Sequence, residues 1–171
     1  MSGGQRNITC DIKNVKRLGV PVGSQAPEID LAAIDGKTVR LSEYRGKIVF
    51  IDFWATWCAP CVAELPNVKE AYEKYHKDGL EVISISFDSD AKTAEKFAQR
   101  KGMTWTQIWA KGGDKSDLAK QYGVAGIPAT FLIGPDGKCV AKDLRGGALV
   151  ERIGEEVAKL RNGRVAAKPT E

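Results

Sequence analysis

Residues 48–66 restrict the possible folds of this chain more than any other part of the sequence. Four consecutive apolar residues, 48–51, predict a strand that is buried on both faces. After an acid, Asp52, and two aromatic residues, the chain carries a C-x-x-C pair, Cys58 and Cys61, followed by helix-compatible residues. The segment therefore predicts a buried strand that delivers two cysteines to the N-terminus of a helix.

The position of the two cysteines predicts thiol-redox chemistry. Unpaired N–H groups and the positive end of the helix dipole stabilise a thiolate at a helix N-terminus, and the thiolate is the nucleophile. Cys58, at the start of the helix, is expected to be the exposed, acidic and attacking thiol. Cys61 lies one turn further along, so it is expected to be shielded and to resolve the mixed disulfide that the attack forms.

Other uses of a C-x-x-C pair fit this sequence less well. Zinc needs four ligands, whereas the two other cysteines, Cys10 and Cys139, are isolated and the chain has one histidine. Val62 stands where a c-type haem attachment requires histidine. A Cys–His hydrolase needs an imidazole beside its thiol, but His76 would lie roughly 25 Å along the helix at ~1.5 Å per residue. We therefore expect neither a metal nor a cofactor.

The surroundings of the cysteines resemble a thioredoxin active site, and the TlpA/ResA-like group in particular. The matching features are the segment DFWATWCAPC, Pro66 eight positions after Cys58, Ile127-Pro128 before an apolar strand, the N-terminal segment GSQAP, and Glu64 three residues past Cys61. The resemblance covers about residues 22–160. It implies a thioredoxin fold, disulfide exchange with protein thiols and disulfides, and an upstream thiol protein that donates electrons.

The resemblance also implies a surface that holds the partner. Ile127-Pro128 matches the cis-proline loop of the family, so we expect a cis bond there. The backbone of Ile127 would then pair with an extended segment of the partner beside the disulfide. Trp57 is expected to be exposed and to shape the same surface. The predicted partner-binding residues are Trp57, Ala59, Pro60, Ile127 and Pro128.

Two acids are candidates for handling the proton of the exchange reaction. Asp52 shares a strand face with Ile48 and Phe50, so burial should raise its pKa and suit it to shuttle the proton of Cys61. Glu64 either lies near the two sulfurs, where its charge would raise the cysteine pKa values, or is a solvated residue on the helix surface. Thioredoxins carry an acid at the first position and the TlpA/ResA-like group at the second. This chain has both, so the assignment stays open.

The remaining pattern predicts one α/β domain. We expect a hairpin over 27–41, a strand over 47–54, a helix over 58–77, a strand over 80–87, a helix over 91–100, a short strand over 105–109, a helix over 117–122, a hairpin over 130–144 and a helix over 149–161. This order indicates a thioredoxin fold: a central mixed β-sheet flanked by helices on both faces, with an N-terminal β-hairpin extension and an inserted helix/strand unit. A flexible arm over 1–20 and a tail over 163–171 would flank the domain, 21–162.

Composition bears on partners and location. The net charge is +4 and the basic residues are scattered, which argues against nucleic acid as a partner. No apolar run approaches the ~18 residues of a membrane span, and the first residues lack the apolar region of a signal peptide. The residues alone leave open a cytosolic protein or a chain without its leader. The resemblance favours an extracytoplasmic protein, and we expect a monomer.

These features predict an enzyme that cycles a Cys58–Cys61 dithiol and disulfide. The resemblance suggests that it reduces disulfides outside the cytoplasm, on apocytochromes or other secreted proteins. One alternative is a thiol-dependent peroxidase, but that class places a proline and a threonine or serine where Ile51 and Ala55 stand here. Another is a non-enzymatic carrier of copper(I) between two thiolates, although the related copper chaperones use a wider cysteine spacing plus a histidine.

Overall fold

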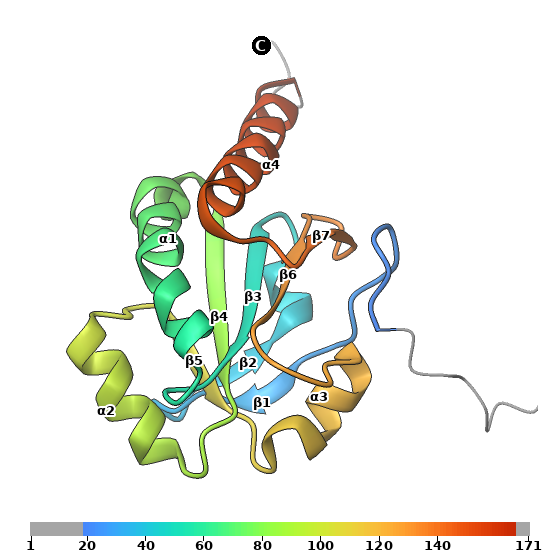
Figure 1. Ribbon diagram of the computed structural model, residues 1–171. Coiled ribbons are helices and arrows are strands. Elements are labelled where there is room, and N and C mark those ends of the chain that lie inside the picture. The colour runs from blue at the N-terminus through green and yellow to red at the C-terminus, as the bar shows by residue number, and fades with distance from the viewer. Residues whose placement is uncertain (1–18, 167–171) are drawn as a thin grey trace, which may run out of the picture.

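A five-stranded mixed sheet forms the centre of the protein (Figure 1). The computed structural model describes residues 19–166. In the sheet order β5-β4-β3-β6-β7, the strands are β5 (Thr106–Trp109), β4 (Leu80–Ser86), β3 (Ile48–Trp54), β6 (Ala129–Ile133) and β7 (Cys139–Lys142). β3 pairs in parallel with β4 and antiparallel with β6. The predicted mixed sheet is therefore confirmed.

Helices cover both faces of this sheet. They are α1 (Ala59–Tyr75), α2 (Ala91–Lys101), α3 (Asp117–Tyr122) and α4 (Gly146–Ala166). The ring of Trp54 lies 5.5 Å from Phe97 of α2, and the ring of Phe53 lies 5.5 Å from Tyr122 of α3. Because successive strand residues point to opposite faces, α2 and α3 pack on opposite sides of β3. α1 packs along α4. Every residue of β3 is buried, as expected for a central strand between two helical layers.

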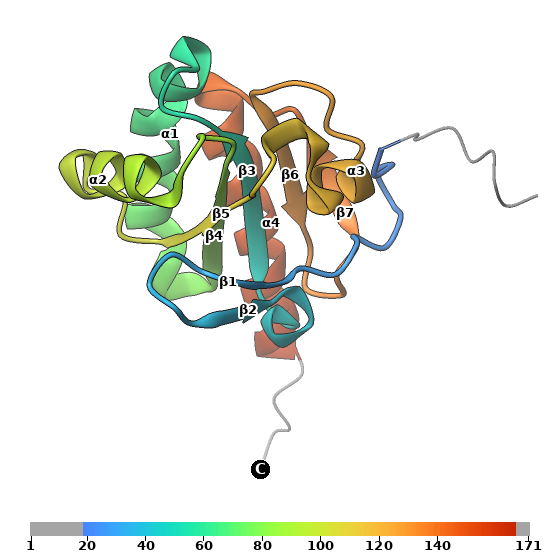
Figure 2. The ribbon, with the colours of Figure 1, turned by 90° about the horizontal axis from the view of Figure 1, so that it is seen from below.

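A two-stranded hairpin precedes the sheet, as predicted. It consists of β1 (Asp30–Ala32) and β2 (Thr38–Arg40), which pair antiparallel. Single bridges join Gln25 to Lys138 and Ala33 to Ile108, so the segment contacts both edges of the central sheet. Figure 2 shows the hairpin in front of the central strands when the molecule is seen from below.

α2 and β5 form the helix/strand unit that follows β4 in the chain, in the region where an insertion was predicted. Asp90 caps α2 by accepting a hydrogen bond from the N–H of Thr93 at 2.9 Å. Gly102 ends the helix with φ +64°, and its N–H donates to the last-turn carbonyls. β5 then pairs in parallel with β4 at the edge of the sheet. The unit widens the sheet by one strand beyond β4.

The last helix differs from the prediction. We expected it over 149–161 with a stop at Asn162-Gly163, whereas α4 runs from Gly146 to Ala166. A helical glycine costs only about 1 kcal/mol, and Arg164 anchors the extra turn by donating to the carbonyl of Gly46 at 2.7 Å. α4 therefore crosses the boundary expected at 162. Residues 1–18, with Cys10, and residues 167–171 lie outside the described part of the chain.

No helix within residues 19–166 combines the length and the apolar character that crossing a membrane requires.

Candidate active site

Cys58 and Cys61 form a disulfide at the N-terminus of α1, with their Cα atoms 5.3 Å apart. Cys58 is the N-cap residue, so the helix starts one position later than predicted. Its sulfur accepts a hydrogen bond from the backbone N–H of Cys61 at 3.3 Å. Pro60 lies in the first turn, where a proline leaves no helical hydrogen bond unmade. The first sulfur therefore occupies the position at which the N–H groups and dipole of α1 stabilise negative charge.

The expected exposure of Cys58 is not seen. In the disulfide, Cys58 is 5% exposed and Cys61 is 3% exposed. The physical reason is the cap itself, because the sulfur of Cys58 turns back over the first helical turn toward Cys61. The exposed rim consists instead of Trp57, at 68% exposure, and of Ala59 and Pro60.

The Ile127–Pro128 loop lies at the same end of the sheet. Its peptide bond is cis, which confirms the prediction, and both residues are half-buried. Ala129, the next residue, pairs with Phe53 near the end of β3. This register brings the loop next to the segment that carries the cysteines. Trp57 and Ile127 line a groove of about 480 Å³ together with residues of the loop after β4.

Asp52, on β3, is buried, as the strand pattern predicted, and only 6% of it is exposed. Burial raises the pKa of Asp52 to about 7; the nearby positive charge of Arg145 opposes this rise, and the negative charge of Glu64 adds to it. An acid with a pKa near neutrality can take up and release a proton at physiological pH.

Glu64 is not a solvated helix-surface residue. One carboxylate oxygen accepts the backbone N–H of Gly146 at 2.8 Å and the side-chain amide of Asn67 at 3.2 Å. The first contact ties α1 to the N-terminus of α4, where a negative charge is favoured. The carboxylate is half-buried and acts on Asp52 through its charge.

Comparison with known proteins identifies the family. The model of the AhpC/TSA family matches residues 22–142. The chain belongs to the AhpC/TSA family. The thiol-disulfide oxidoreductase ResA of Geobacillus thermodenitrificans is 37% identical over 147 residues, which cover 85% of this chain and 82% of that protein.

Solved structures agree with this assignment. The thioredoxin domain of a thiol-disulfide oxidoreductase from Bacteroides vulgatus has a TM-score of 0.75 and 30% identity, covering 81% of this chain and 99% of that one. A thiol:disulfide interchange protein from Bacteroides sp. has the same TM-score and identity and covers 86% and 97%. The chain is therefore a ResA-like thiol-disulfide oxidoreductase with a thioredoxin fold, and its substrates are protein thiols and disulfides.

Sequence reasoning missed an acid that holds the cysteine-bearing loop of this ResA-like oxidoreductase. Asp88, which is 3% exposed, accepts hydrogen bonds from the N–H of Thr56 at 3.2 Å and from its hydroxyl at 2.6 Å. It also accepts the hydroxyl of Ser86 at 2.7 Å. The carboxylate thus links the ends of β3 and β4. One signal could have found it, because the carboxyl ends of neighbouring parallel strands meet at one edge of a sheet.

Replacing Asp88 by alanine should destabilise the protein by roughly 3 kcal/mol, because the half-buried donors of Thr56 and the buried hydroxyl of Ser86 lose their acceptor. Urea unfolding followed by tryptophan fluorescence measures the loss. Asp114→Ala is the matched control, since this exposed acid lines the same groove and should change stability by less than about 0.5 kcal/mol. Equal losses of stability from the two substitutions would show that Asp88 does not hold the cysteine-bearing loop.

Proposed function

We propose that this protein reduces disulfide bonds of protein partners outside the cytoplasm. The proposal rests on the redox-active cysteine pair at a helix N-terminus, which is bordered by exposed Trp57 and by the Ile127–Pro128 loop. In the reduced protein, the thiolate of Cys58 attacks one sulfur of the partner's disulfide, and the other sulfur leaves as a thiolate that takes up a proton. Cys61 then attacks the sulfur of Cys58, which releases the partner's second thiol and leaves the Cys58–Cys61 disulfide.

The two electrons that pass to the partner must be replaced. An upstream protein dithiol would reduce the Cys58–Cys61 disulfide by the same exchange in the opposite sense, becoming oxidised itself. The resemblance to the TlpA/ResA-like group supports this direction and the extracytoplasmic location, and we propose that the protein acts as a monomer. The resemblance also supports apocytochromes and other secreted proteins as substrates.

Asp52 is proposed to accept the proton of Cys61 during release of the partner. It is buried on β3, the strand that leads to Cys58, and burial raises its pKa to about 7. A base of that strength can take the proton of the resolving thiol and return it to solvent afterwards. Glu64, through its charge, is proposed to tune both Asp52 and the cysteines.

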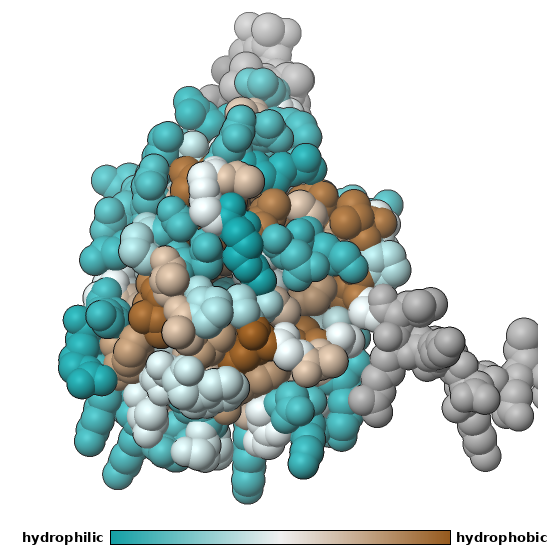
Figure 3. All heavy atoms as spheres, in the orientation of Figure 1, coloured by the Kyte–Doolittle hydropathy of each residue, from teal (hydrophilic) through white to brown (hydrophobic). Residues whose placement is uncertain are grey.

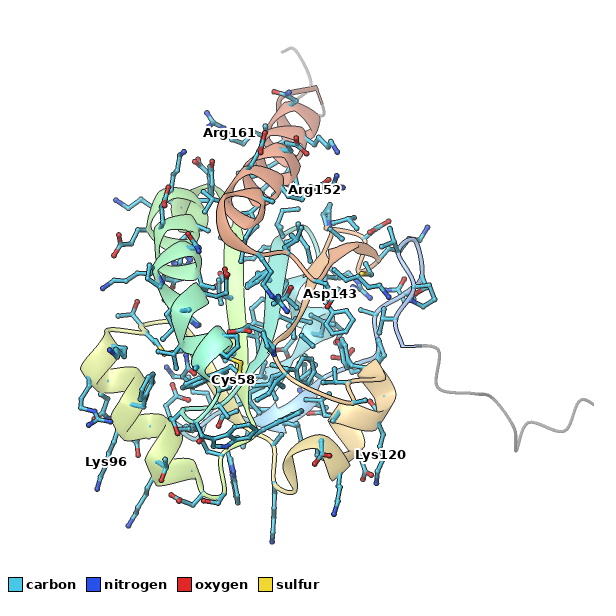
Figure 4. The ribbon with its side chains drawn as sticks, in the orientation of Figure 1. Cys58, Lys96, Lys120, Asp143, Arg152 and Arg161 are labelled. Carbon is cyan, nitrogen blue, oxygen red and sulfur yellow. A yellow bond between two sulfur atoms is a disulfide. The ribbon has the colours of Figure 1, made fainter. Side chains whose placement is uncertain are left out.

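The partner is proposed to bind across Trp57, Ala59, Pro60, Ile127 and Pro128. In Figure 3, neutral and apolar residues gather in the lower half of the face, where Figure 4 labels Cys58. Hydrophilic side chains cover the region of α4. An exposed tryptophan beside an open backbone segment suits an unfolded or extended partner, which offers its backbone as a strand and its side chains to the groove.

Trapping in the native host tests this function. Cys61→Ser should remain joined to its substrates through Cys58, and mass spectrometry of the trapped complexes would identify them. Recovery of secreted or membrane-facing proteins would support the proposal. A thiol-dependent peroxidase would show fast loss of the Cys58 thiol with hydrogen peroxide in stopped-flow experiments. A copper(I) carrier would bind the metal at one equivalent with loss of two titratable thiols.

Glu64→Gln should increase the thiolate fraction of Cys58 at a given pH, because a nearby negative charge is removed. Glutamine keeps an oxygen that can accept the N–H of Gly146, so stability should change by less than about 1 kcal/mol. Thiolate absorbance followed against pH in the reduced protein measures the effect. Glu70→Gln, on the exposed side of α1, is the control. Titration curves of Glu64→Gln that superimpose on wild type would exclude an electrostatic role.

A further inference from the structure

Arg145, at the junction of β7 and α4, reaches across to the Ile127–Pro128 loop. One terminal nitrogen of its guanidinium donates to the carbonyl of Pro128 at 2.7 Å. The other donates to the carbonyl of Leu144 at 2.9 Å and lies 3.4 Å from the hydroxyl of Thr130. The side chain is half-buried. The planar guanidinium therefore binds Pro128 and Thr130 at the start of β6, and Leu144 in its own segment.

The same junction contacts Glu64 and acts on Asp52 through the charge of Arg145. Thr130 is the cross-strand partner of Asp52, and its hydroxyl accepts the N–H of Leu144 at 2.9 Å. The charge of Arg145 acts on Asp52. The next residue, Gly146, donates its N–H to Glu64. Residues 144–146 thus join the partner-binding loop, the acid of β3 and the acid of α1.

We propose that Arg145 is a positioning residue for disulfide exchange, because its guanidinium fixes the carbonyl of Pro128 and with it the backbone of Ile127 on which a partner segment pairs. This inference rests on the proposed function. A backbone edge accepts an extended segment only when its N–H and C=O groups stand at strand spacing. The peptide that joins Ile127 to Pro128 is one residue away from the held carbonyl, so a displacement of that carbonyl moves the pairing edge directly.

Lysine and glutamine at position 145 separate the two effects of the arginine. Lysine keeps the positive charge near Asp52 but lacks the planar fork, so it cannot hold all three acceptors. Glutamine removes both the charge and the fork.

The charged groups acting on Asp52 are Arg145 and, from α1, Glu64. The residues opposite Asp52 on the neighbouring strands carry no charge. They are Ser84 on β4 and Thr130 on β6. When the disulfide is reduced, Cys58 and Cys61 are further titratable groups of the site.

Arg152→Gln is the matched control. Arg152 also donates to a backbone carbonyl, that of Val140, at 3.2 Å. It lies on α4, and Figure 4 places it well away from Cys58, whereas Asp143 marks the start of the junction that carries Arg145. Arg152→Gln therefore shows the effect of removing a carbonyl-bound guanidinium that does not contact the partner-binding loop.

Three measurements on the full chain test the proposal. The first is amide hydrogen exchange of Ala129 and Thr130, the first residues of β6, in the oxidised protein, which should be roughly tenfold faster in Arg145→Gln and unchanged in Arg152→Gln. The second compares the reduction of insulin with the reduction of 5,5′-dithiobis(2-nitrobenzoic acid), a small disulfide without a backbone to pair. The ratio of the two rate constants should fall about tenfold in Arg145→Gln, somewhat less in Arg145→Lys, and stay constant in Arg152→Gln.

The third measurement is the pH profile of insulin reduction. Its midpoint should move upward in Arg145→Gln, because the cation that opposes the raised pKa of Asp52 is gone, and should stay in place in Arg145→Lys. Arg145→Lys also keeps the test decisive if Arg145→Gln does not fold.

Two results would overturn the inference. Equal falls of both rate constants, with an unchanged ratio, would reduce Arg145 to a general stabilising residue. Exchange of Ala129 and Thr130 in Arg145→Gln that matches their exchange in Arg152→Gln would exclude the positioning role. Failure of the proposed function looks different: wild type would not reduce insulin, or Cys58→Ser would still reduce it. The exchange measurement then still decides whether Arg145 holds the loop.

Discussion

Replacing Cys58 by serine should abolish disulfide exchange, and replacing Cys61 by serine should leave the protein joined to its partner. A serine hydroxyl is not ionised at neutral pH, so it cannot attack a disulfide sulfur. Cys61 supplies the thiol at the start of α1 that displaces the partner from Cys58. Insulin reduction measures the first effect, and non-reducing electrophoresis with mass spectrometry measures the second.

Cys139→Ser is the control for these two variants. Cys139 is a buried free thiol that donates to the carbonyl of Ala141 at 3.3 Å, and burial raises its pKa. In the sheet, Cys139 lies opposite Ile133 of β6. Ile133 in turn lies opposite Val49, at the end of β3 that is remote from Cys58. Replacing Cys139 should therefore leave the exchange rate unchanged. Faster labelling of Cys61 than of Cys58 by iodoacetamide in the reduced protein would reverse the assigned roles.

Replacing Asp52 by asparagine should stabilise the protein at pH 8 by about 2–4 kcal/mol and slow release of the partner at least about tenfold. The pKa of Asp52 lies near 3.8 in the unfolded chain and is raised to about 7 in the folded protein. Between these values the folded state holds a proton that the unfolded state has lost, so wild-type stability falls as pH rises from about 4 to 7. Asparagine has no charge to bury.

Urea unfolding at several pH values tests this prediction. The stability difference between Asp52→Asn and wild type should be small at pH 4, should grow up to pH 7 and should then stay constant. Asp30→Asn, at an exposed position of β1, is the control and should not reproduce this pattern. A constant difference between Asp52→Asn and wild type at all pH values would show that Asp52 does not titrate between the two states.

Local patterns in the sequence predicted the elements of the fold and the core of the site. The apolar run at 48–51 and the alternation at 80–87 predicted two strands, because strand periodicity and β-branched residues depend on neighbouring positions alone. Cys58 and Cys61 were placed at a helix N-terminus for the same reason. The cis bond at Ile127–Pro128 came from resemblance to a family rather than from physics, since most X-Pro bonds are trans.

The sequence by itself determined which segments become strands and helices and where the two thiols lie, because these features follow from periodicity, caps and spacing within a few residues. Only the tertiary structure decided which distant groups meet. Arg145 contacts a carbonyl 17 residues away and Gly146 a carboxylate 82 residues away. Asp88 holds Thr56 across 32 positions. Such contacts depend on strand register and on the packing of α1 against α4, and no local pattern records either of them. The added residues of α4 have the same origin, since a long-range contact such as that of Arg164 with Gly46 outweighs local propensity.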